Sequence, residues 1–337
     1  MLEKPAISEE TLLVSLQQEY AISGASIDFL PIGADPDAAV YRAVAADGAP
    51  YFVKLRTGAF SEITVTLPGF LHDQGLRQVI APLVTRTGRR WASLGAGALI
   101  VYPFVAGRDG YATDLTPAHW AEFGAALRRL HTLALPQALR AQLPREAFST
   151  RWRDAVHGFL DRAAARFDDP VAAETAAFLR ANRTAIETLV EHAAQLAAAL
   201  CAQTPEFVLC HTDAHAGNLL LGADGDLYIV DWDNPLLAPK ERDLMFPGGA
   251  QGFRGHSPAE EERLFACGYG PAEIDRRALA YYRCERIIED IAVYCEQLLM
   301  SDAGGADRAQ SLYYLRSNFL PGGTIERAYA ALSLLDS

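Results

Sequence analysis

The sequence has few cysteines, no long hydrophobic run and no leader-like start. Its five cysteines are odd in number and lack paired spacing, which predicts reduced thiols in a cytoplasmic protein. The longest apolar run, residues 98–106, is far too short to cross a bilayer and contains Pro103, so we predict no membrane partner. The first residues show no basic region followed by an apolar stretch, so we predict no secretory signal.

Positive charge is also scarce. The chain holds 30 Lys and Arg against 42 Asp and Glu, a formal net charge of −12, and its pI is near 5.1. This balance disfavours a nucleic-acid partner, because phosphates need a basic surface. It suits a small cationic molecule drawn toward an acidic cleft, although solubility alone would explain it equally well. We expect a monomer.

The pattern of elements changes near residue 103. Before it lie short strand-like runs and two helical patterns, and after it lie long alanine-rich helical patterns. Strands are predicted at 27–32, 39–45, 51–56, 83–87, 90–94 and 98–102, and helices at 8–20, 62–71, 117–132, 149–166, 171–200 and 278–300. A β-rich insert at 219–230 interrupts the later helices. The sequence therefore predicts an α+β fold with an antiparallel-sheet lobe at 1–103, a mainly helical lobe at 104–337 and a hinge at 102–107.

The segment His211-Thr212-Asp213-Ala214-His215-Ala216-Gly217-Asn218 carries the strongest chemical pattern. In kinase-type phosphoryl transfer, an aspartate at this spacing receives the hydroxyl proton. An asparagine five residues later and a second aspartate hold magnesium. Asp231 follows the apolar run 227–230, where an unpaired carboxylate would be costly, so a cation partner is expected. We predict Asp213 as the catalytic base and Asn218 and Asp231 as Mg²⁺ ligands. Their alternative role is ordinary turn hydrogen bonding.

Lys54 lies inside the apolar strand 51–56 and is predicted to contact the phosphates of ATP. An edge lysine reaching for solvent is the alternative. Glu62 opens the next predicted helix, where it can pair with Lys54 or simply favour the helix terminus. The loop at 33–38 follows a predicted strand but holds one glycine, Gly33, and matches no glycine-rich phosphate motif.

At the predicted hinge, the backbone of two residues is suited to a nucleotide base. Pro103 has no amide hydrogen and can only accept a hydrogen bond, whereas Val105 can donate one. We therefore include both, with Gly33, among the predicted nucleotide-binding residues.

Together these residues resemble the aminoglycoside phosphotransferase family, over nearly the whole chain. The most specific stretches are V-L-C-H-T-D-A-H-A-G-N at 208–218, Y-I-V-D-W-D-N-P-L-L-A-P-K-E-R-D-L-M-F at 228–246, Y-Y-R-C-E-R-I-I-E-D-I-A-V-Y at 281–294 and Y-P-F-V at 102–105. The resemblance implies a protein-kinase-like fold and ATP-dependent phosphorylation of a ring hydroxyl on an aminocyclitol or aminoglycoside antibiotic, with spectinomycin as first candidate. It implies the same roles for Asp213, Asn218 and Asp231, and places Lys54 on the α- and β-phosphates. Thr212 stands where many members of the family have glycine.

The acceptor is less constrained by the sequence. Two carboxylates of the predicted helix at 278–300, Glu285 and Glu289, lie on one face at i,i+4 spacing and suit a charged amine. A salt-bridged helix face, with Arg283 or Arg286 as partner, explains them equally well. The segment 239–243 is predicted to be structural, with Arg242 and Asp243 forming an ion pair or a helix cap. A metabolic hydroxyl kinase of the same fold and a nucleotide-binding pseudokinase remain alternative functions.

Overall fold

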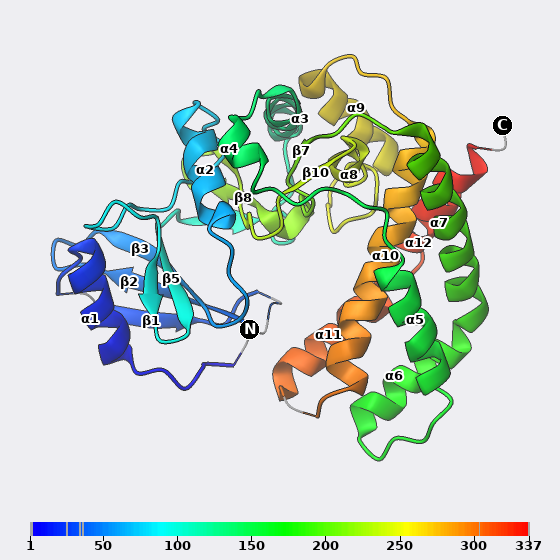
Figure 1. Cartoon of the computed structure of the whole chain (residues 1–337), viewed down its shortest axis with the longest axis horizontal. Coiled ribbons are helices and arrows are strands. Elements are labelled where there is room, and N and C mark those ends of the chain that lie inside the picture. Colours follow the sequence, from blue (N-terminus) through cyan, green and yellow to red (C-terminus); the bar gives the residue numbers. More distant parts are fainter. Residues whose placement is uncertain (1–2, 25, 34, 36, 303, 336–337) are drawn as a thin grey trace. The chain divides into compact units, whose positions relative to one another are not determined.

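The computed structural model describes residues 3–24, 26–33, 35, 37–302 and 304–335 (Figure 1). By its contacts the chain divides into two compact units, each of them discontinuous in sequence. The first comprises Met1–Thr113, Leu135–Leu143 and Gly217–Pro235, and the second comprises Asp114–Ala134, Pro144–Ala216 and Leu236–Ser337. The predicted lobe boundary at 102–107 stays a prediction. Among the described helices, none combines the length and apolarity that a membrane span requires.

The first unit is built on a five-stranded antiparallel sheet of order β1-β2-β3-β5-β4. Its strands are β1 (Ser26–Leu30), β2 (Ala38–Val44), β3 (Pro50–Arg56), β4 (Ala92–Leu94) and β5 (Gly97–Pro103). An Asp47-Gly48 turn, a sequence typical of hairpins, joins β2 to β3, and Gly48 adopts the positive φ of 87° that such a turn requires. Helix α1 (Glu9–Tyr20) begins after Ser8, whose hydroxyl accepts from the amide of Thr11 at 3.1 Å, as predicted.

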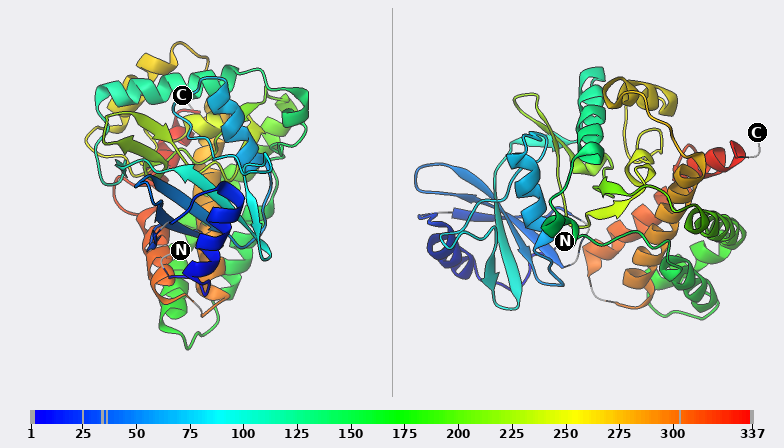
Figure 2. Two further views of the ribbon diagram at one scale, coloured as in Figure 1. Left: turned by 90° about the vertical axis from the view of Figure 1, so that its left-hand side faces the viewer. Right: turned by 45° about the horizontal axis from the view of Figure 1, so that its top comes forward.

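Helix α1 packs its buried leucines and Tyr20 on one face of this sheet (Figure 2). Helix α2 (Ile63–Asp73) follows β3, close to the predicted range. A smaller antiparallel sheet in the same unit has the order β6-β8-β9. It contains β6 (Gly107–Asp109), β8 (Leu219–Gly222) and β9 (Leu227–Ile229). The short helix η1 (Ala216–Asn218) directly precedes β8, and α4 (Gln137–Arg140) belongs to the same unit.

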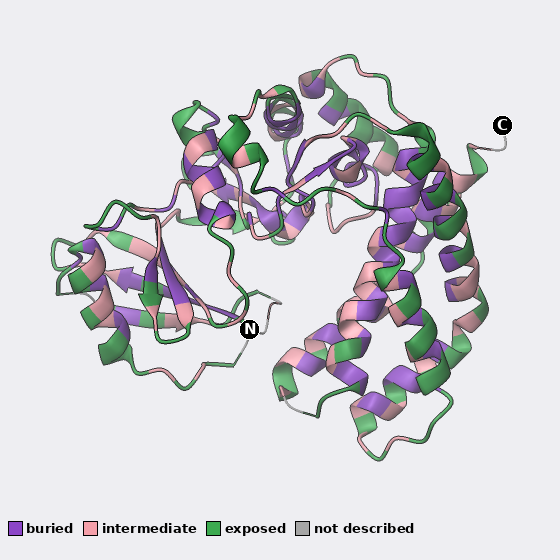
Figure 3. Cartoon of the chain, in the orientation of Figure 1, coloured by how far each residue is buried: buried purple, intermediate pink, exposed green. Residues whose placement is uncertain are grey.

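The second unit is helical around α10 (Arg276–Leu299). Helices α5 (Arg151–Arg162), α6 (Pro170–Ala181), α7 (Arg183–Gln203), α11 (Gly305–Ser317) and α12 (Thr324–Ser333) all contact it. Fourteen residues of α10 are buried, and they are coloured purple along the helix in Figure 3. Many of them belong to the hydrophobic core of this unit. Strands β7 (Val208–Cys210) and β10 (Leu236–Ala238) pair with each other, and α8 (Glu241–Leu244) follows β10.

Two element predictions are wrong, and local hydrogen bonds explain both. Within the described segment 83–87 there is no strand. The Thr85 hydroxyl accepts from the amide of Arg89 at 3.0 Å and closes a turn instead. The range 171–200 is two helices rather than one. At the break, the side-chain amide of Asn182 donates to the carbonyl of Phe178 at 2.9 Å, so Asn182 ends α6 and α7 starts afresh.

Helices α3 (Pro117–Thr132) and α9 (Pro258–Tyr269) approach at two glycines. An added Cβ at Gly124 would collide with the carbonyl oxygen of Phe265, and one at Gly268 with that of Ala121. Both obstacles are backbone atoms in helices, so neither can move without shifting a helix.

We therefore expect Gly268→Ala to lower the free energy of unfolding by about 1–3 kcal/mol, the usual cost of overpacking. Urea denaturation measures it. The matched control is Gly158→Ala in α5, where no atom lies within 4 Å of the added carbon. That change should stabilise by about 0.5–1 kcal/mol, because alanine is the better helix former. Equal effects of the two substitutions would contradict the close helix contact.

Candidate active site

A cavity of about 570 Å³ lies in the first unit, beside β3 and the segments that flank it. Its walls come from the β1–β2 connection, β3, the end of β5 and the segment after β9. The predicted residues that line it are Gly33, Lys54, Pro103, Val105, Asn218 and Asp231. Glu62 is not among the lining residues, whereas Asp213, Glu285 and Glu289 belong to the second unit. The structure thus brings six of the predicted residues to one cavity.

Lys54 is held by two carboxylates. Its Nζ donates to Asp231 Oδ1 at 2.9 Å and to Asp233 Oδ2 at 2.7 Å. Burial would lower the pKa of this amine, but the two carboxylates outweigh burial and raise it well above its usual range. Lys54 is therefore a permanent cation in the cavity wall. Asp233 was assigned no role from the sequence, although its spacing of two from Asp231 could have suggested a shared partner.

Arg56 extends this cluster. Its Nη1 lies 2.9 Å from Asp233 Oδ2 and 2.8 Å from Asp35 Oδ2, which is on the loop after β1. Burial and repulsion by Asp231 raise the pKa of Asp233, while Lys54 and Arg56 act against that rise. The predicted loop at 33–38 includes positions 34 and 36, which lie outside the described residues.

The donor chemistry at Asn218 and Asp231 fits a divalent metal ion such as Mg²⁺. One supplies an amide oxygen and the other a carboxylate, both on the cavity wall, and such hard oxygens are the ligands that Mg²⁺ prefers. The amide of Val230 donates to the carbonyl of Asn218 at 2.9 Å, which ties the two segments together. Asp231 has a φ of 65°, a left-handed conformation that directs the chain sharply out of β9.

The predicted pair of Lys54 and Glu62 is not formed among the described residues. Glu62 Oε1 instead accepts from Arg89 Nη2 at 2.7 Å and from Trp91 Nε1 at 3.1 Å. The Arg89 guanidinium also stacks 3.9 Å above the Trp91 ring. A role for Glu62 toward the nucleotide stays a prediction. At the predicted hinge, Pro103 pairs with Tyr51 in the β3–β5 ladder, so the backbone of β5 is fixed up to the start of the hinge.

In the second unit, Asp213 follows β7 and meets an arginine of α10. Arg286 Nη1 lies 2.6 Å from Asp213 Oδ1, and His215 Nε2 lies 3.6 Å from Oδ2. The amide of Asp213 donates to His211 Nδ1 at 3.2 Å. Burial would raise the pKa of Asp213, but Arg286 and the two histidines outweigh it and hold the pKa far below its usual range. Asp213 is therefore ionised at any physiological pH.

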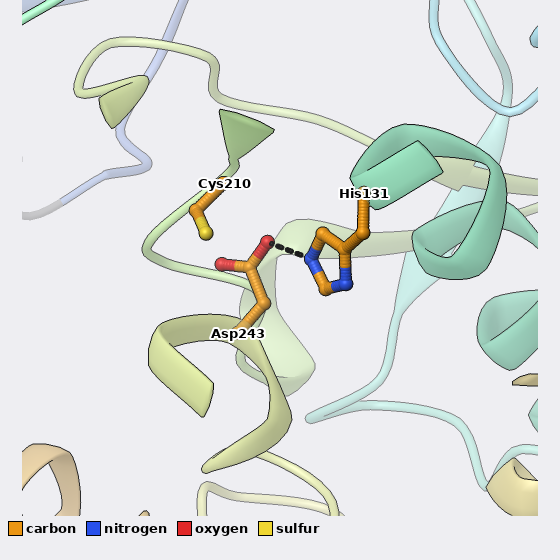
Figure 4. A group of neighbouring side chains, drawn as sticks. All are labelled: His131, Cys210 and Asp243. Carbon is orange, nitrogen blue, oxygen red and sulfur yellow. Dashed lines mark hydrogen bonds and ion pairs between the residues drawn. The ribbon is translucent and has the colours of Figure 1, made fainter. Parts of the chain in front are cut away.

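The backbone just before Asp213 is anchored by a buried carboxylate that the sequence did not reveal. Asp243 accepts from the amide of His211 at 2.8 Å and from that of Thr212 at 2.7 Å. His131 Nε2 lies 3.0 Å from Asp243 Oδ2, and Cys210 lies beside the pair (Figure 4). Arg242 and Asp243 were predicted to be structural, as an ion pair or a helix cap; they do not pair with each other, because Arg242 reaches Glu289 and Asp243 reaches His131. Asp243 lies thirty residues after Asp213 in the sequence, and no short spacing links the two.

His131, Cys210 and Asp243 offer ligand atoms within 4.8 Å of one another, a set that can bind a metal. Their hydrogen bonds account for the cluster without one. His131 Nδ1 lies 2.8 Å from the Tyr269 hydroxyl, and both Asp243 oxygens receive backbone amides. Burial also raises the pKa of the Cys210 thiol, which opposes metal binding. The cluster is a support for the loop.

The two carboxylates predicted to meet the acceptor have internal partners. Glu285 is paired with Arg153 of α5, and Glu289 with Arg242 at 3.2 Å. Burial raises the pKa of Glu285 to about 7, against the attraction of Arg153. The partners differ from those considered from the sequence, because Arg283 pairs with Glu262, and Arg286 with Asp213 and Asp290. Of the two glutamates, Glu289 is the more accessible.

We expect Asp243→Asn to lower the free energy of unfolding by about 1–3 kcal/mol, because the amide nitrogen cannot accept from a buried backbone amide. Urea denaturation at neutral pH measures this loss. Burial would raise the pKa of Asp243, but hydrogen bonds from His131 and Thr212 keep this pKa below its usual value. Its stabilisation is therefore present at neutral pH and is lost as the pH falls through that lowered pKa.

The exposed Asp168→Asn is the control and should leave stability unchanged. Thr212 has a φ of 77°, a strained conformation for a β-branched residue. We expect Thr212→Gly to be neutral or to stabilise by up to about 1 kcal/mol, since glycine adopts this conformation freely. If the free energy of unfolding of Asp243→Asn equals that of the Asp168→Asn control, the anchoring role of Asp243 is refuted.

Comparison with known proteins identifies the family and the fold. The model of the phosphotransferase enzyme family matches residues 28–248. A spectinomycin phosphotransferase, APH(9)-Ia, solved in complex with ADP and spectinomycin, is 35% identical, with a TM-score of 0.89 over 97% of this chain and 99% of that chain. Its AMP-bound complex gives a TM-score of 0.84 at 35% identity, over 96% and 99% of the two chains.

An aminoglycoside phosphotransferase from Alicyclobacillus acidocaldarius is similar in fold alone, at 14% identity and a TM-score of 0.60 over 99% of this chain and 96% of that chain. The family resemblance and the α+β kinase-like fold expected from the sequence are both confirmed. The family model spans the cavity-lining residues, Asp213 and Asp243 in one continuous match. The chain belongs to the phosphotransferase enzyme family.

Proposed function

We propose that this protein transfers the γ-phosphoryl group of ATP to a ring hydroxyl of an aminocyclitol antibiotic, spectinomycin. The observation that carries the proposal is the 35% identity to a spectinomycin phosphotransferase over 97% of this chain. The alignment covers 97% of this chain and so includes most of the helical second unit, where family members that act on different acceptors would be expected to diverge. The site geometry supports the phosphoryl-transfer part of the proposal independently.

The cavity of the first unit has the groups that a nucleoside triphosphate needs. Lys54 is a fixed cation for the phosphates, and Asn218 and Asp231 would hold Mg²⁺. Bound Mg²⁺ neutralises phosphate charge during the transfer. Gly33, Pro103 and Val105 would contact the nucleotide through their backbone atoms. On nucleotide binding, Asp231 would exchange its bond to Lys54 for the metal, which frees the ammonium for the phosphates.

Asp213 would orient the acceptor hydroxyl and receive its proton. The hydroxyl oxygen forms a bond to the γ-phosphorus, the bond from that phosphorus to the bridging oxygen breaks, and ADP leaves with the electron pair. The proton passes to the carboxylate of Asp213. Because the pKa of this carboxylate is held low, proton transfer comes late, after most of the charge has moved.

The acceptor is proposed to be cationic, and the second unit offers acidic side chains for its amines. Glu289 is the better candidate, since its carboxylate is partly exposed. Glu285 is enclosed with Arg153 and would act only if that pair opened. The net charge of −12 is compatible with electrostatic attraction of a dication.

The purified protein should consume ATP when spectinomycin is added, and Asp213→Asn should reduce turnover by about 10²- to 10⁴-fold, the usual contribution of a general base. The KM for ATP should change little, because Asp213 is outside the nucleotide cavity. Coupled ADP release measures both. Other aminoglycosides, choline, ethanolamine, homoserine and sugars form the comparison panel. A metabolic alcohol that outperforms spectinomycin would replace the proposed acceptor, and no turnover with any acceptor would exclude the kinase assignment.

Lys54→Ala should raise the KM for ATP more than that for the acceptor, because it removes the cation of the cavity wall. Lys4→Ala, at an exposed ion pair, is the matched control and should behave like the parent.

Glu62→Gln should leave the KM for ATP within about twofold of the parent, since surface ion pairs contribute little. A large rise would instead show that Glu62 turns to Lys54 when nucleotide binds. Excess chelator should abolish activity.

A further inference from the structure

We propose that Arg286 is the positioning residue of Asp213, and that Asp290 in turn holds Arg286. This inference deepens the proposed function and rests on it. It gives a residue of α10 a role in positioning the catalytic carboxylate, in addition to the contribution of this helix to the core of its unit.

The contacts form a short ionic chain inside the second unit. Arg286 Nη1 lies 2.6 Å from Asp213 Oδ1, and Arg286 Nε lies 3.1 Å from Asp290 Oδ1 at i,i+4 on the same helix. Asp290 Oδ2 accepts from the side-chain amide of Asn318 at 3.4 Å. The guanidinium therefore lies between two carboxylates, with a hydrogen bond to Asp213 and an ion pair with Asp290.

Burial makes this arrangement persistent. The side chains of Arg286 and Asp290 are each 17% exposed, and that of Asp213 is 28% exposed. A charge left without its partner at such a site is more costly than one at the surface, because less water is there to solvate it. Two carboxylates share one guanidinium, so Arg286 stays protonated and cannot compete with Asp213 as an acid or base.

The other charged groups around the pair do not replace Arg286. His215 lies 3.6 Å from the second oxygen of Asp213, and His211 accepts from its backbone amide. Glu289 and Tyr294 act on Arg286 electrostatically and favour its charged form. Arg153 and Arg242 of neighbouring elements are engaged with Glu285 and Glu289.

Arg286 would set both the direction and the basicity of Asp213. With Oδ1 held by the guanidinium, the carboxylate cannot rotate, and Oδ2 is directed to the His215 side. An acceptor hydroxyl then meets an oriented, fully ionised oxygen. Phosphoryl transfer requires this kind of positioning more than it requires a strong base.

The test compares four variants in steady-state kinetics across pH, with the acceptor that the parent uses. Arg286→Gln should lower kcat by about 10- to 100-fold through misplacement of the carboxylate, with the KM for ATP unchanged. It should also move the acid limb of the kcat profile to higher pH. The limb moves in this direction because Arg286 lowers the pKa of Asp213, so that without Arg286 the carboxylate becomes protonated at a higher pH.

Arg286→Lys should restore the position of the acid limb in part, because it keeps the charge but loses the fixed planar geometry. Asp290→Asn should fall between this variant and the parent. Arg283→Gln is the matched control, since it removes a buried arginine of the same helix that pairs with Glu262 instead of Asp213. An Arg286→Gln profile whose acid limb stays with the parent, or with the Arg283 control, overturns the proposal.

A second measurement needs no turnover. Acid unfolding is followed for the parent, Asp213→Asn, Arg286→Gln and the double variant. If the pair is coupled, Arg286→Gln should begin to unfold at higher pH than the parent, and the two substitutions should be non-additive. Additive effects overturn the pairing. An inactive parent with non-additive unfolding refutes the proposed function alone, whereas an active parent with an unmoved acid limb refutes the role of Arg286.

Discussion

The two backbone amides that donate to Asp243 are the contacts on which the site depends. They fix His211 and Thr212 in a conformation that the chain would not otherwise adopt, with a φ of 77° at a threonine. Strain of this kind costs on the order of 1–3 kcal/mol and persists only where surrounding contacts impose it. A wholly buried carboxylate that is held by His131 can impose it, because breaking either bond would leave a buried group unpaired. The direction in which Asp213 leaves the loop follows from that anchor.

The same physical solution recurs at each carboxylate that the proposed chemistry uses. Asp231 and Asp233 share Lys54, and Asp213 shares Arg286 with Asp290. A cation that belongs to the chain therefore lies against each of these acids inside the protein. In the first unit Asp231 could exchange its contact with Lys54 for one with a metal ion, because Asp231 is still partly exposed and lines a cavity. In the second unit Arg286 lies between two carboxylates, those of Asp213 and Asp290, so it is a permanent part of the proposed site.

The sequence predicts what is local and fails where the partner is distant. Helix α1 and the turn at Gly48 could be predicted, because a capping serine and an Asp-Gly pair act within a few residues. Six of the predicted residues line one cavity. Asn218 and Asp231 were suggested by the spacing of a kinase-type motif, whereas Gly33, Pro103 and Val105 were chosen for their backbone atoms. The partners of Glu62 were missed, as Arg89 and Trp91 compete for it from 27 and 29 residues away. Asp243 and Arg286 were missed for the same reason, because only the folded chain shows which charge each one meets.

The low basicity of Asp213 is consistent with the reaction proposed for it. A strong base is needed where a proton must leave before the bond forms, but metaphosphate-like transfer puts little demand on the nucleophile. The protein can then use its binding energy to hold the carboxylate still, and a buried arginine does this at the expense of basicity. A carboxylate without Arg286 would be a stronger base, because the effect of burial on its pKa would be less opposed, yet it would be free to rotate. The geometry therefore favours orientation over proton affinity, which is the more useful property when the transition state carries its charge on the phosphoryl oxygens.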